Sequence, residues 1–164
     1  MQPSIEHIIE IHQAKIYKTC LGFTGDAEQA KDLWQEVCIN LWIGLEKFRG
    51  NAAIATWVYR VTVNTCLMYQ RKKRLQTVPL ESTHSAKLQQ SDKYSKPDSG
   101  VAQLQRYIAE LPEKDRLIMV LYLENLTYDE IAEIIGVSSN YIGVKINRIK
   151  KILSKKFKEN DSET

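Results

Sequence analysis

The sequence contains few of the residues that break helices, cross-link a chain or bind metals. Seven glycines, four prolines and an apolar fraction of 43% argue against a globally disordered chain. The three cysteines, Cys20, Cys38 and Cys66, are odd in number and form no C-x-x-C pair. We therefore expect buried thiols in a reducing compartment. The three histidines are scattered without metal-ligand spacing, so we expect no metal and no cofactor.

Long apolar runs and catalytic motifs are also missing. No stretch of about 18 apolar residues occurs, and the first residues lack the apolar core of a signal peptide, so we expect a soluble, cytoplasmic protein. The chain has no glycine-rich phosphate loop, no nucleophile elbow and no histidine–carboxylate metal spacing. The adjacent carboxylates of Asp129 and Glu130 fit the first turn of a helix, where negative charge complements the helix dipole. An enzyme is therefore the least favoured class, and we expect no small-molecule substrate.

The sequence does show helical periodicity, on both sides of one break in composition. No alternating strand pattern appears. Residues 77–99 mix Ser, Thr, Lys, Asp and two prolines without helical spacing, which is typical of a flexible linker. We predict an all-α fold of two small helical domains, residues 1–76 and 100–160, joined by that linker. In the first domain we expect helices over residues 3–23, 27–48 and about 53–75.

The clearest of these helices is predicted from Ala27 to Phe48, after the capping residue Asp26. Its apolar residues recur every three or four positions, as on one buried helix face: Ala30, Leu33, Trp34, Val37, Cys38, Leu41, Trp42 and Leu45. Its other face is polar: Glu28, Lys31, Asp32, Gln35, Glu36 and Asn40. Taken alone, such a polar face is expected to contact only water.

Residues 126–153 have the pattern of a helix, a tight turn and a second helix. Thr127 and Glu130 form a capping box for the first helix, and Gly136 suits the left-handed conformation that ends it. Ser138 is a good N-cap for the second helix, and Asn125 tolerates the left-handed turn expected before the first. The predicted apolar faces are Tyr128, Ile131, Ala132 and Ile135, then Ile142, Ile146, Ile149 and Leu153.

Charge is distributed unevenly across this pair of helices. Residues 106–136 include three basic and seven acidic residues, whereas residues 137–158 include seven basic and no acidic residues. A pair of short helices in which only the second is basic suits a helix-turn-helix, because that helix enters a groove lined by phosphates. The alternative is an ordinary helical hairpin with a solvated basic face. We favour DNA binding.

Residues 47–80 form a second basic segment. They contain no acidic residue and seven basic ones: Lys47, Arg49, Arg60, Arg71, Lys72, Lys73 and Arg74. Four aromatic residues are interleaved with them: Phe48, Trp57, Tyr59 and Tyr69. Basic side chains can follow a phosphate backbone while aromatic rings stack on unpaired bases. Alternatively, Phe48 and Trp57 are core residues, and the cations complement the C-terminus of a helix.

Both segments carry motifs in the order and spacing of a known family. D-L-x-Q-E-V and F-R-G-x-x-x-x-x-T-W-x-Y-R-x-x-x-N occur between Asp26 and Leu67, which resembles region two of a bacterial RNA polymerase sigma factor. L-P-x-x-x-R and Y-x-E-I-A-E-x-x-G occur between Glu110 and Leu153, which resembles region four. The small size and the missing third domain are similar to the extracytoplasmic function (ECF) group of the sigma-70 family.

The resemblance implies a function and partners. It implies a sigma factor that binds core RNA polymerase and directs promoter-specific transcription initiation, with promoter DNA and an anti-sigma factor as further partners. The first domain would bind polymerase and then recognise and melt the minus-ten element; the second would read the minus-thirty-five element. We expect a monomer when the protein is free. The alternative is a stand-alone helix-turn-helix regulator, which would need a dimer interface that the sequence does not offer.

The resemblance also implies three sets of site residues, and neither a catalytic residue nor a metal ligand. The polymerase-binding residues are Asp32, Gln35, Glu36 and Asn40. The minus-ten and melting residues are Arg49, Asn51, Trp57, Arg60, Asn64, Arg71, Lys72 and Arg74. The minus-thirty-five residues are Ser139, Asn140, Tyr141, Val144, Lys145, Arg148 and Lys151. For two residues the sequence leaves an alternative open: Trp57 as a core residue, and Asn64 as a buried helix residue bonded to backbone.

Overall fold

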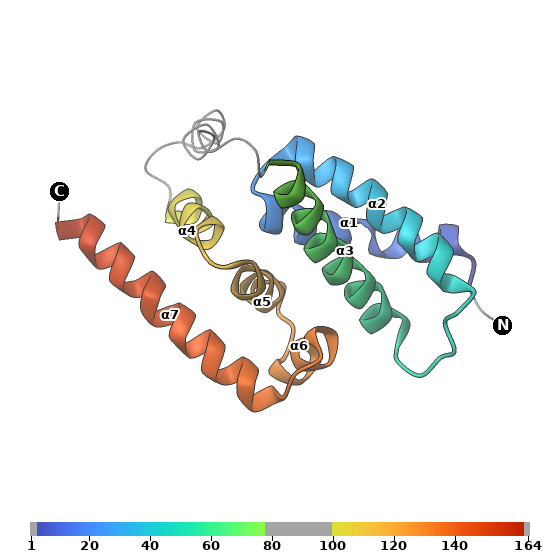
Figure 1. The fold of residues 1–164 in the computed structure, drawn as a ribbon. Coiled ribbons are helices and arrows are strands. Elements are labelled where there is room, and N and C mark those ends of the chain that lie inside the picture. Colours follow the sequence, from blue (N-terminus) through green and yellow to red (C-terminus); the bar gives the residue numbers. More distant parts are fainter. Residues whose placement is uncertain (1–2, 78–99, 163–164) are drawn as a thin grey trace.

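The architecture is entirely helical. The computed structural model describes residues 3–77 and 100–162, and within these ranges the chain forms seven α-helices and no strand (Figure 1). This confirms the predicted all-α fold in two helical parts. The linker predicted over residues 77–99 lies, apart from Thr77 at the end of a helix, outside the described residues. None of the helices in the described ranges is long and apolar enough to cross a membrane.

The first half of the chain, residues 3–77, forms three helices that pack against one another. The predicted cap of the second helix is confirmed, because the carboxylate of Asp26 accepts a hydrogen bond from the Glu28 N–H at 2.9 Å. Gly25 ends the first helix in the left-handed conformation, with φ of 70°. The helices are α1 (Ile5–Thr24), α2 (Ala27–Leu45) and α3 (Ile54–Thr77).

Helix α2 differs from its prediction at its C-terminal end. It stops at Leu45 rather than Phe48, because the following N–H groups bond carbonyls only three residues back, as from Lys47 to Gly44. Trp42 was predicted to be buried, but 60% of it is exposed. The reason is that residues 37–43 are apolar nearly all round the helix, and α1 and α3 cover only part of that circumference. The buried positions are Ala30, Leu33, Val37 and Leu41.

The second half, residues 100–162, contains four helices. Helix α7 lies along one flank, on the side away from the first half (Figure 1). A small apolar cluster holds α4, α5 and α7 together, built around Ile108, Val120 and Ile149. The predicted turn before the helix-turn-helix is confirmed at Asn125, whose φ is 66°. The helices are α4 (Gly100–Ala109), α5 (Glu113–Leu123), α6 (Tyr128–Ile135) and α7 (Ser139–Ser162).

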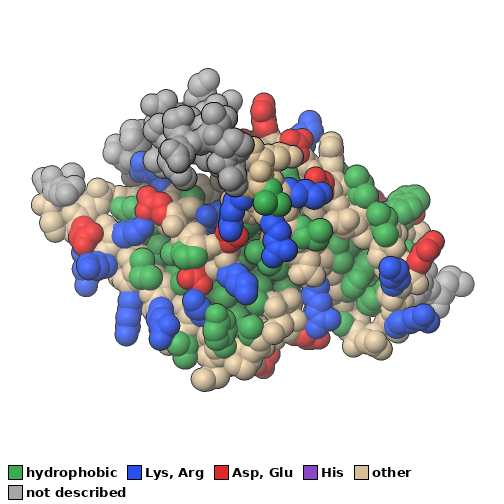
Figure 2. All heavy atoms as spheres, viewed as in Figure 1, with side chains coloured by type: hydrophobic (Ala, Val, Ile, Leu, Met, Phe, Trp, Pro, Cys, Tyr) green, Lys and Arg blue, Asp and Glu red, His purple; other side chains and the backbone are tan. Residues whose placement is uncertain are grey.

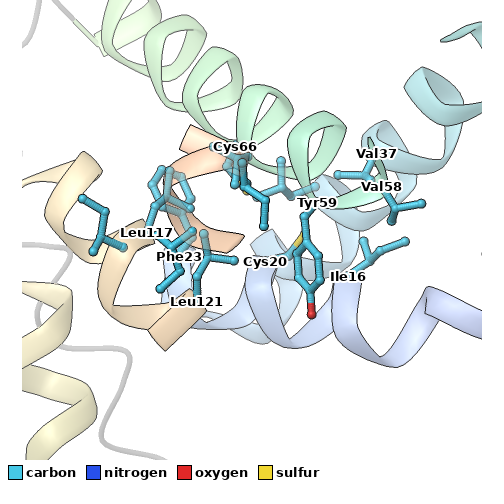
Figure 3. Close-up of a cluster of buried hydrophobic side chains, with 14 of the residues drawn as sticks. Ile16, Cys20, Phe23, Val37, Val58, Tyr59, Cys66, Leu117 and Leu121 are labelled. Carbon is cyan, nitrogen blue, oxygen red and sulfur yellow. The ribbon is translucent and has the colours of Figure 1, made fainter. Parts of the chain in front are cut away.

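The two halves share one hydrophobic core. Helix α1 packs against α5 and α4, and α3 packs against α6. Figure 3 shows Phe23 of α1 beside Leu117 and Leu121 of α5, with Cys66 of α3 close by. These side chains are almost fully buried, and each apolar side chain of this kind stabilises the folded state by about 1.5–3 kcal/mol. The halves therefore bury apolar side chains against each other as well as within themselves.

Candidate nucleic-acid interface

The helix-turn-helix is built as the sequence predicts. The Thr127 side chain accepts a hydrogen bond from the Glu130 N–H at 3.2 Å, and the Glu130 carboxylate accepts one from the Thr127 N–H at 3.4 Å, which completes the capping box. Gly136 ends α6 with φ of 87°. The Ser138 hydroxyl then accepts a hydrogen bond from the Tyr141 N–H at 3.1 Å and caps α7. Two capped helices at a fixed turn place the outer face of α7 precisely enough to meet a groove.

The outer face of α7 is polar and basic. Its core residues, Ile142, Ile146, Ile149 and Leu153, are buried as predicted. Most of the predicted minus-thirty-five residues lie on the opposite side and are exposed: Asn140, Tyr141, Val144, Arg148 and Lys151. Figure 2 shows Lys and Arg side chains along α7 and again over α3, on the same face of the molecule. In helix-turn-helix proteins, exposed side chains near the N-terminus of the second helix contact base edges. We expect the exposed side chains further along α7 to contact phosphates.

Two members of the predicted minus-thirty-five set are engaged inside the second half. The Ser139 hydroxyl donates a hydrogen bond to the Asp129 carboxylate, which links the two helices of the motif. The Lys145 ammonium lies 3.1 Å from the Asp115 carboxylate and 5.8 Å from the centroid of the Tyr141 ring. Both residues are half-buried. They orient the recognition helix, and their contact with DNA stays a prediction.

The turn between α2 and α3 holds its aromatic residues together. The Phe48 and Trp57 rings lie 5.1 Å apart, and the Trp57 side chain covers Gly44 of α2. Trp57 is half-buried, which favours the core alternative over a free stacking platform. Arg49 and Asn51 of the same turn are exposed. They remain available to an unpaired base or its phosphate.

Helix α3 presents an exposed polar side chain at the position where the sequence left two alternatives. Asn64 is exposed, so the alternative of a buried residue bonded to backbone is wrong. Arg71 and Lys72 are also exposed, about two turns further on. An exposed amide followed by two cations is an arrangement that can hold a base edge and the adjoining phosphates.

Two other arginines of α3 contact the second half of the chain. The Arg60 Nε–H donates a hydrogen bond to the Glu133 carbonyl at 3.1 Å, and its Nη2 lies 3.9 Å from the Glu133 carboxylate. Arg74 forms an ion pair with Glu113 of α5. Both arginines belong to the predicted minus-ten set. Sequence reasoning missed these pairs because the partners lie far apart in the chain and their pairing depends on how the halves pack.

The predicted polymerase-binding residues of α2 do not all share one face. Asp32 and Gln35 are exposed and Glu36 is half-buried. The Asn40 amide instead turns toward α3 and donates a hydrogen bond to the Thr65 hydroxyl at 2.9 Å. Two exposed apolar residues that the sequence reading missed, Ile39 and Ile43, follow Asp32 and Glu36 along the same side of α2. The signal was present in the all-round apolar run of residues 37–43.

The three cysteines lie near one another in the first half as free thiols. A hydrogen bond with the Cys20 side chain and then burial raise the pKa of the Cys66 thiol. Burial, followed by the nearby Cys20, raises the pKa of Cys38. A raised pKa keeps a thiol protonated and unreactive near neutral pH. Cys20 and Cys66 are buried as expected, Cys38 is half-buried, and the described residues contain no cluster that could hold a metal.

The fold and these surfaces define a class: an all-helical protein with a helix-turn-helix and a second basic helix. Two family models then match the chain in sequence order. The model for Sigma-70 region 2 matches residues 8–76, and the model for Sigma-70, region 4 matches residues 102–153. The chain belongs to the sigma-70 family of RNA polymerase sigma factors.

Relatives over nearly the whole chain agree with this assignment. The chain is 27% identical over 175 residues to the ECF RNA polymerase sigma factor SigW of Bacillus subtilis, covering 96% of this chain and 91% of that protein. It is 28% identical over 156 residues to the RNA polymerase sigma-H factor of Pseudomonas aeruginosa, covering 88% and 81%. The resemblance to ECF sigma factors inferred from the motifs is therefore confirmed.

Solved structures support the fold. The sigma factor RpoE of Bartonella quintana, in complex with the anti-sigma factor NepR, superimposes with a TM-score of 0.73 at 16% identity, covering 93% of this chain and 96% of that one. CnrH in complex with the cytosolic domain of CnrY gives a TM-score of 0.68 at 17% identity, covering 94% and 88%. Both likenesses span the two halves of the chain.

Proposed function

We propose that the chain is an ECF-type sigma factor that binds core RNA polymerase and directs promoter-specific initiation, acting in the cytoplasm by binding rather than catalysis. The observation that carries this is the order of surfaces along one chain. A polar α2 face, a basic α3 and a capped helix-turn-helix follow one another as the two matched sigma-70 regions do. The stand-alone regulator is not favoured, since the two matched regions and the relatives that cover nearly the whole chain are those of sigma factors.

Helix α2 supplies the polymerase contact. Asp32, Gln35 and Glu36 form its acidic and polar part, and the exposed Ile39 and Ile43 extend the same side. A charged rim next to apolar side chains is the usual composition of a specific protein interface. Asn40 supports this face from behind, because its amide is bonded to Thr65.

Helix α3 and the turn before it hold the melted minus-ten strand. Extruding a base costs a few kcal/mol, so the site must supply contacts to both base and phosphate. Asn51 and Asn64 offer amides, and Arg49, Arg71 and Lys72 offer exposed cations. Trp57 positions the turn by packing on Phe48 and Gly44.

Helix α7 reads the minus-thirty-five element in the major groove. Asn140 and Tyr141 lie exposed at its N-terminal end, where helix-turn-helix proteins contact base edges. Arg148 and Lys151 lie about two to three turns further along the helix and contact phosphates. Ser139 and Lys145 hold the helix through Asp129 and Asp115.

An anti-sigma factor is a further partner of the free protein. Both superimposed structures are complexes, one with the anti-sigma factor NepR and one with the cytosolic domain of CnrY. The free chain is a monomer, and its partner in the absence of an inducing signal is a protein of that class.

Run-off transcription with purified core polymerase on genomic fragments tests the proposal. Discrete products are expected with core enzyme and the chain together, and the chain should co-purify with core polymerase. The stand-alone regulator would bind DNA without co-purifying. Equal products from core polymerase with and without the chain would contradict the proposed function.

A further inference from the structure

Helix α3 exposes two large apolar side chains on the face that we propose holds the melted strand. Met68 is 58% exposed and Leu75 is 71% exposed. Neither side chain belongs to an apolar cluster formed by the described residues. Single exposed apolar residues are common on protein surfaces and need no explanation. Met68, however, lies within a row of polar and basic side chains, and this placement indicates a contact.

The row follows one line along α3. Its members are spaced by four, three and four residues, so they lie one above another on a single helix face, and all are exposed: Asn64, Met68, Arg71 and Leu75. Buried side chains of the same stretch, such as Thr62 and Cys66, lie on the opposite side of the helix. The row therefore points directly away from the core. Neighbouring members have Cβ atoms about 5–6 Å apart.

The charge around this row favours nucleic acid as the partner rather than a protein. Residues 47–80 contain no acidic residue. Arg71 and Lys72 are exposed about one turn beyond Met68, and such cations suit phosphate oxygens. An apolar side chain next to two phosphate-binding cations is placed to contact a base, because the backbone of a nucleic acid offers mainly charged and polar oxygens.

The chemistry of the bases indicates which group Met68 contacts. The edges of the bases present hydrogen-bond donors and acceptors, and the 5-methyl group of thymine is the apolar exception. A methionine side chain has no donor and only a weakly accepting sulfur. It is also unbranched and polarizable, so it adapts its shape to a small apolar group. Met68 therefore matches thymine better than it matches the other bases.

We infer that Met68 is a specificity-determining residue whose side chain contacts the 5-methyl group of an unpaired thymine in the strand held by α3. This inference rests on the proposed function. Asn64, one turn before Met68, offers an amide to an adjacent base edge, and Arg71, one turn after it, offers a cation to a phosphate. The row thus adds an apolar contact to the hydrogen bonds and charges already assigned to this face.

The expected preference follows from the size of the group. Uracil differs from thymine only by the lack of the 5-methyl group, so the exchange removes the contact and leaves the hydrogen-bonding edge intact. The transfer free energy of one buried methyl-sized group corresponds to about a fourfold change in affinity.

Two pools of short single-stranded DNA with random sequence test this inference. One pool contains thymine, and the other contains uracil in its place. Each pool is incubated with core polymerase bound to the chain, and with core polymerase alone as background, and the retained strands are quantified and sequenced. The wild-type chain is compared with Met68→Ala, which removes the contact, and with Met68→Leu, which keeps an apolar side chain.

The matched control is Ile11→Ala, because Ile11 of α1 is also 58% exposed and lies on a different helix. Met68 and Ile11 are both exposed, so neither alanine variant opens a cavity in the core. Circular dichroism checks that each variant keeps its helicity.

We expect the wild-type chain to select thymine at one position about fourfold more strongly than it selects uracil there. Met68→Leu and Ile11→Ala should keep this preference. Met68→Ala should lose it while binding the uracil pool as well as the wild-type chain does.

Three results would overturn the inference. The first is a wild-type chain that selects thymine and uracil equally, and the second is an unchanged thymine preference in Met68→Ala. The third is an equal loss of binding to both pools in Met68→Ala, which would make Met68 a wedge between bases instead. If core polymerase with the chain retains no more DNA than core polymerase alone, the proposed function itself is contradicted, and this inference with it.

Discussion

The two basic surfaces of the molecule, on α7 and on α3, differ in whether their polar and basic side chains are exposed or paired within the chain. On α7, Asn140, Tyr141 and Lys151 face outward and are exposed. On α3, Arg60 and Arg74 are paired with carboxylates of the second half. The surface that we propose reads the minus-thirty-five element is therefore exposed, whereas two arginines of the surface that we propose for the minus-ten element are paired within the chain. The comparison shows that basic residues concentrated in two segments of the sequence end in different surroundings, exposed along α7 but paired at Arg60 and Arg74 of α3.

This difference follows from the chemistry of the two halves. Residues 106–136 are acidic and lie next to the basic α3, while α7 has its own apolar face turned inward and its cations turned out. The uneven distribution of charge along the sequence thus has two consequences. It leaves cations exposed on α7, where we propose that DNA binds, and it places carboxylates beside arginines of α3. The first consequence depends on exposure, and the second depends on the packing of the halves.

The largest effect is expected where neither DNA surface is involved. Replacing Asp32 and Glu36 by alanine removes two charged contacts of α2, each contributing about 1–3 kcal/mol at an interface. Affinity for core polymerase, measured by fluorescence anisotropy, should fall by at least tenfold while helicity is retained, because neither side chain is buried in the core. Glu10→Ala, an exposed carboxylate on α1, is the charge control. Unchanged affinity in the folded double variant would remove the α2 assignment.

The next largest effect distinguishes the proposed base contact of Asn140 from the proposed phosphate contact of Lys151, both on α7. Asn140→Ala should weaken use of the upstream element by about 1–3 kcal/mol at the preferred base and far less at other bases. The matched variant Lys151→Ala should weaken all sequences about equally and reduce the slope of log affinity against log salt by about 0.9, because a phosphate contact carries no base information. Transcription from a set of upstream-element variants at several salt concentrations measures both. Base-independent loss in Asn140→Ala would contradict the reading role.

The smallest effect concerns α3. Alanine at Arg71 and Lys72 should slow strand opening several-fold, since two exposed cations that hold melted DNA are lost. Permanganate footprinting, which detects unpaired thymines, measures this on one promoter. Lys155→Ala with Lys158→Ala removes the same charge from the far end of α7 and is the control. If the DNA strands open normally with the Arg71 and Lys72 variant but less with the control, the assignment of strand opening to α3 is wrong.

The sequence predicted local features well where the cause was local. The capping box at Thr127, the left-handed Gly136 and the buried face of Ile142 and Ile146 depend on neighbours within one turn of helix, and all are confirmed. The exposure of Trp42 and Ile43 was missed because it depends on how far α1 and α3 extend around α2. The pairing of Arg60 with Glu133 was missed because it joins residues 73 positions apart. No periodicity in the sequence encodes the packing of one half on the other.

The ordered motifs indicated the protein family, which helical periodicity alone does not. A polar helix face and a basic segment each had an ordinary alternative, namely contact with water alone. The ordered motifs around Asp32, Arg60 and Arg116 indicated a family, and the two family models confirm it. The individual DNA and polymerase contacts remain predictions.

Transcription by core RNA polymerase, with and without the chain, tests the central claim most directly. The purified chain is added to core polymerase on genomic fragments, and the run-off products are compared with those of core polymerase alone. Discrete products that require the chain are expected, because both matched regions are those of sigma-70 factors. Equal products with and without the chain would contradict the account.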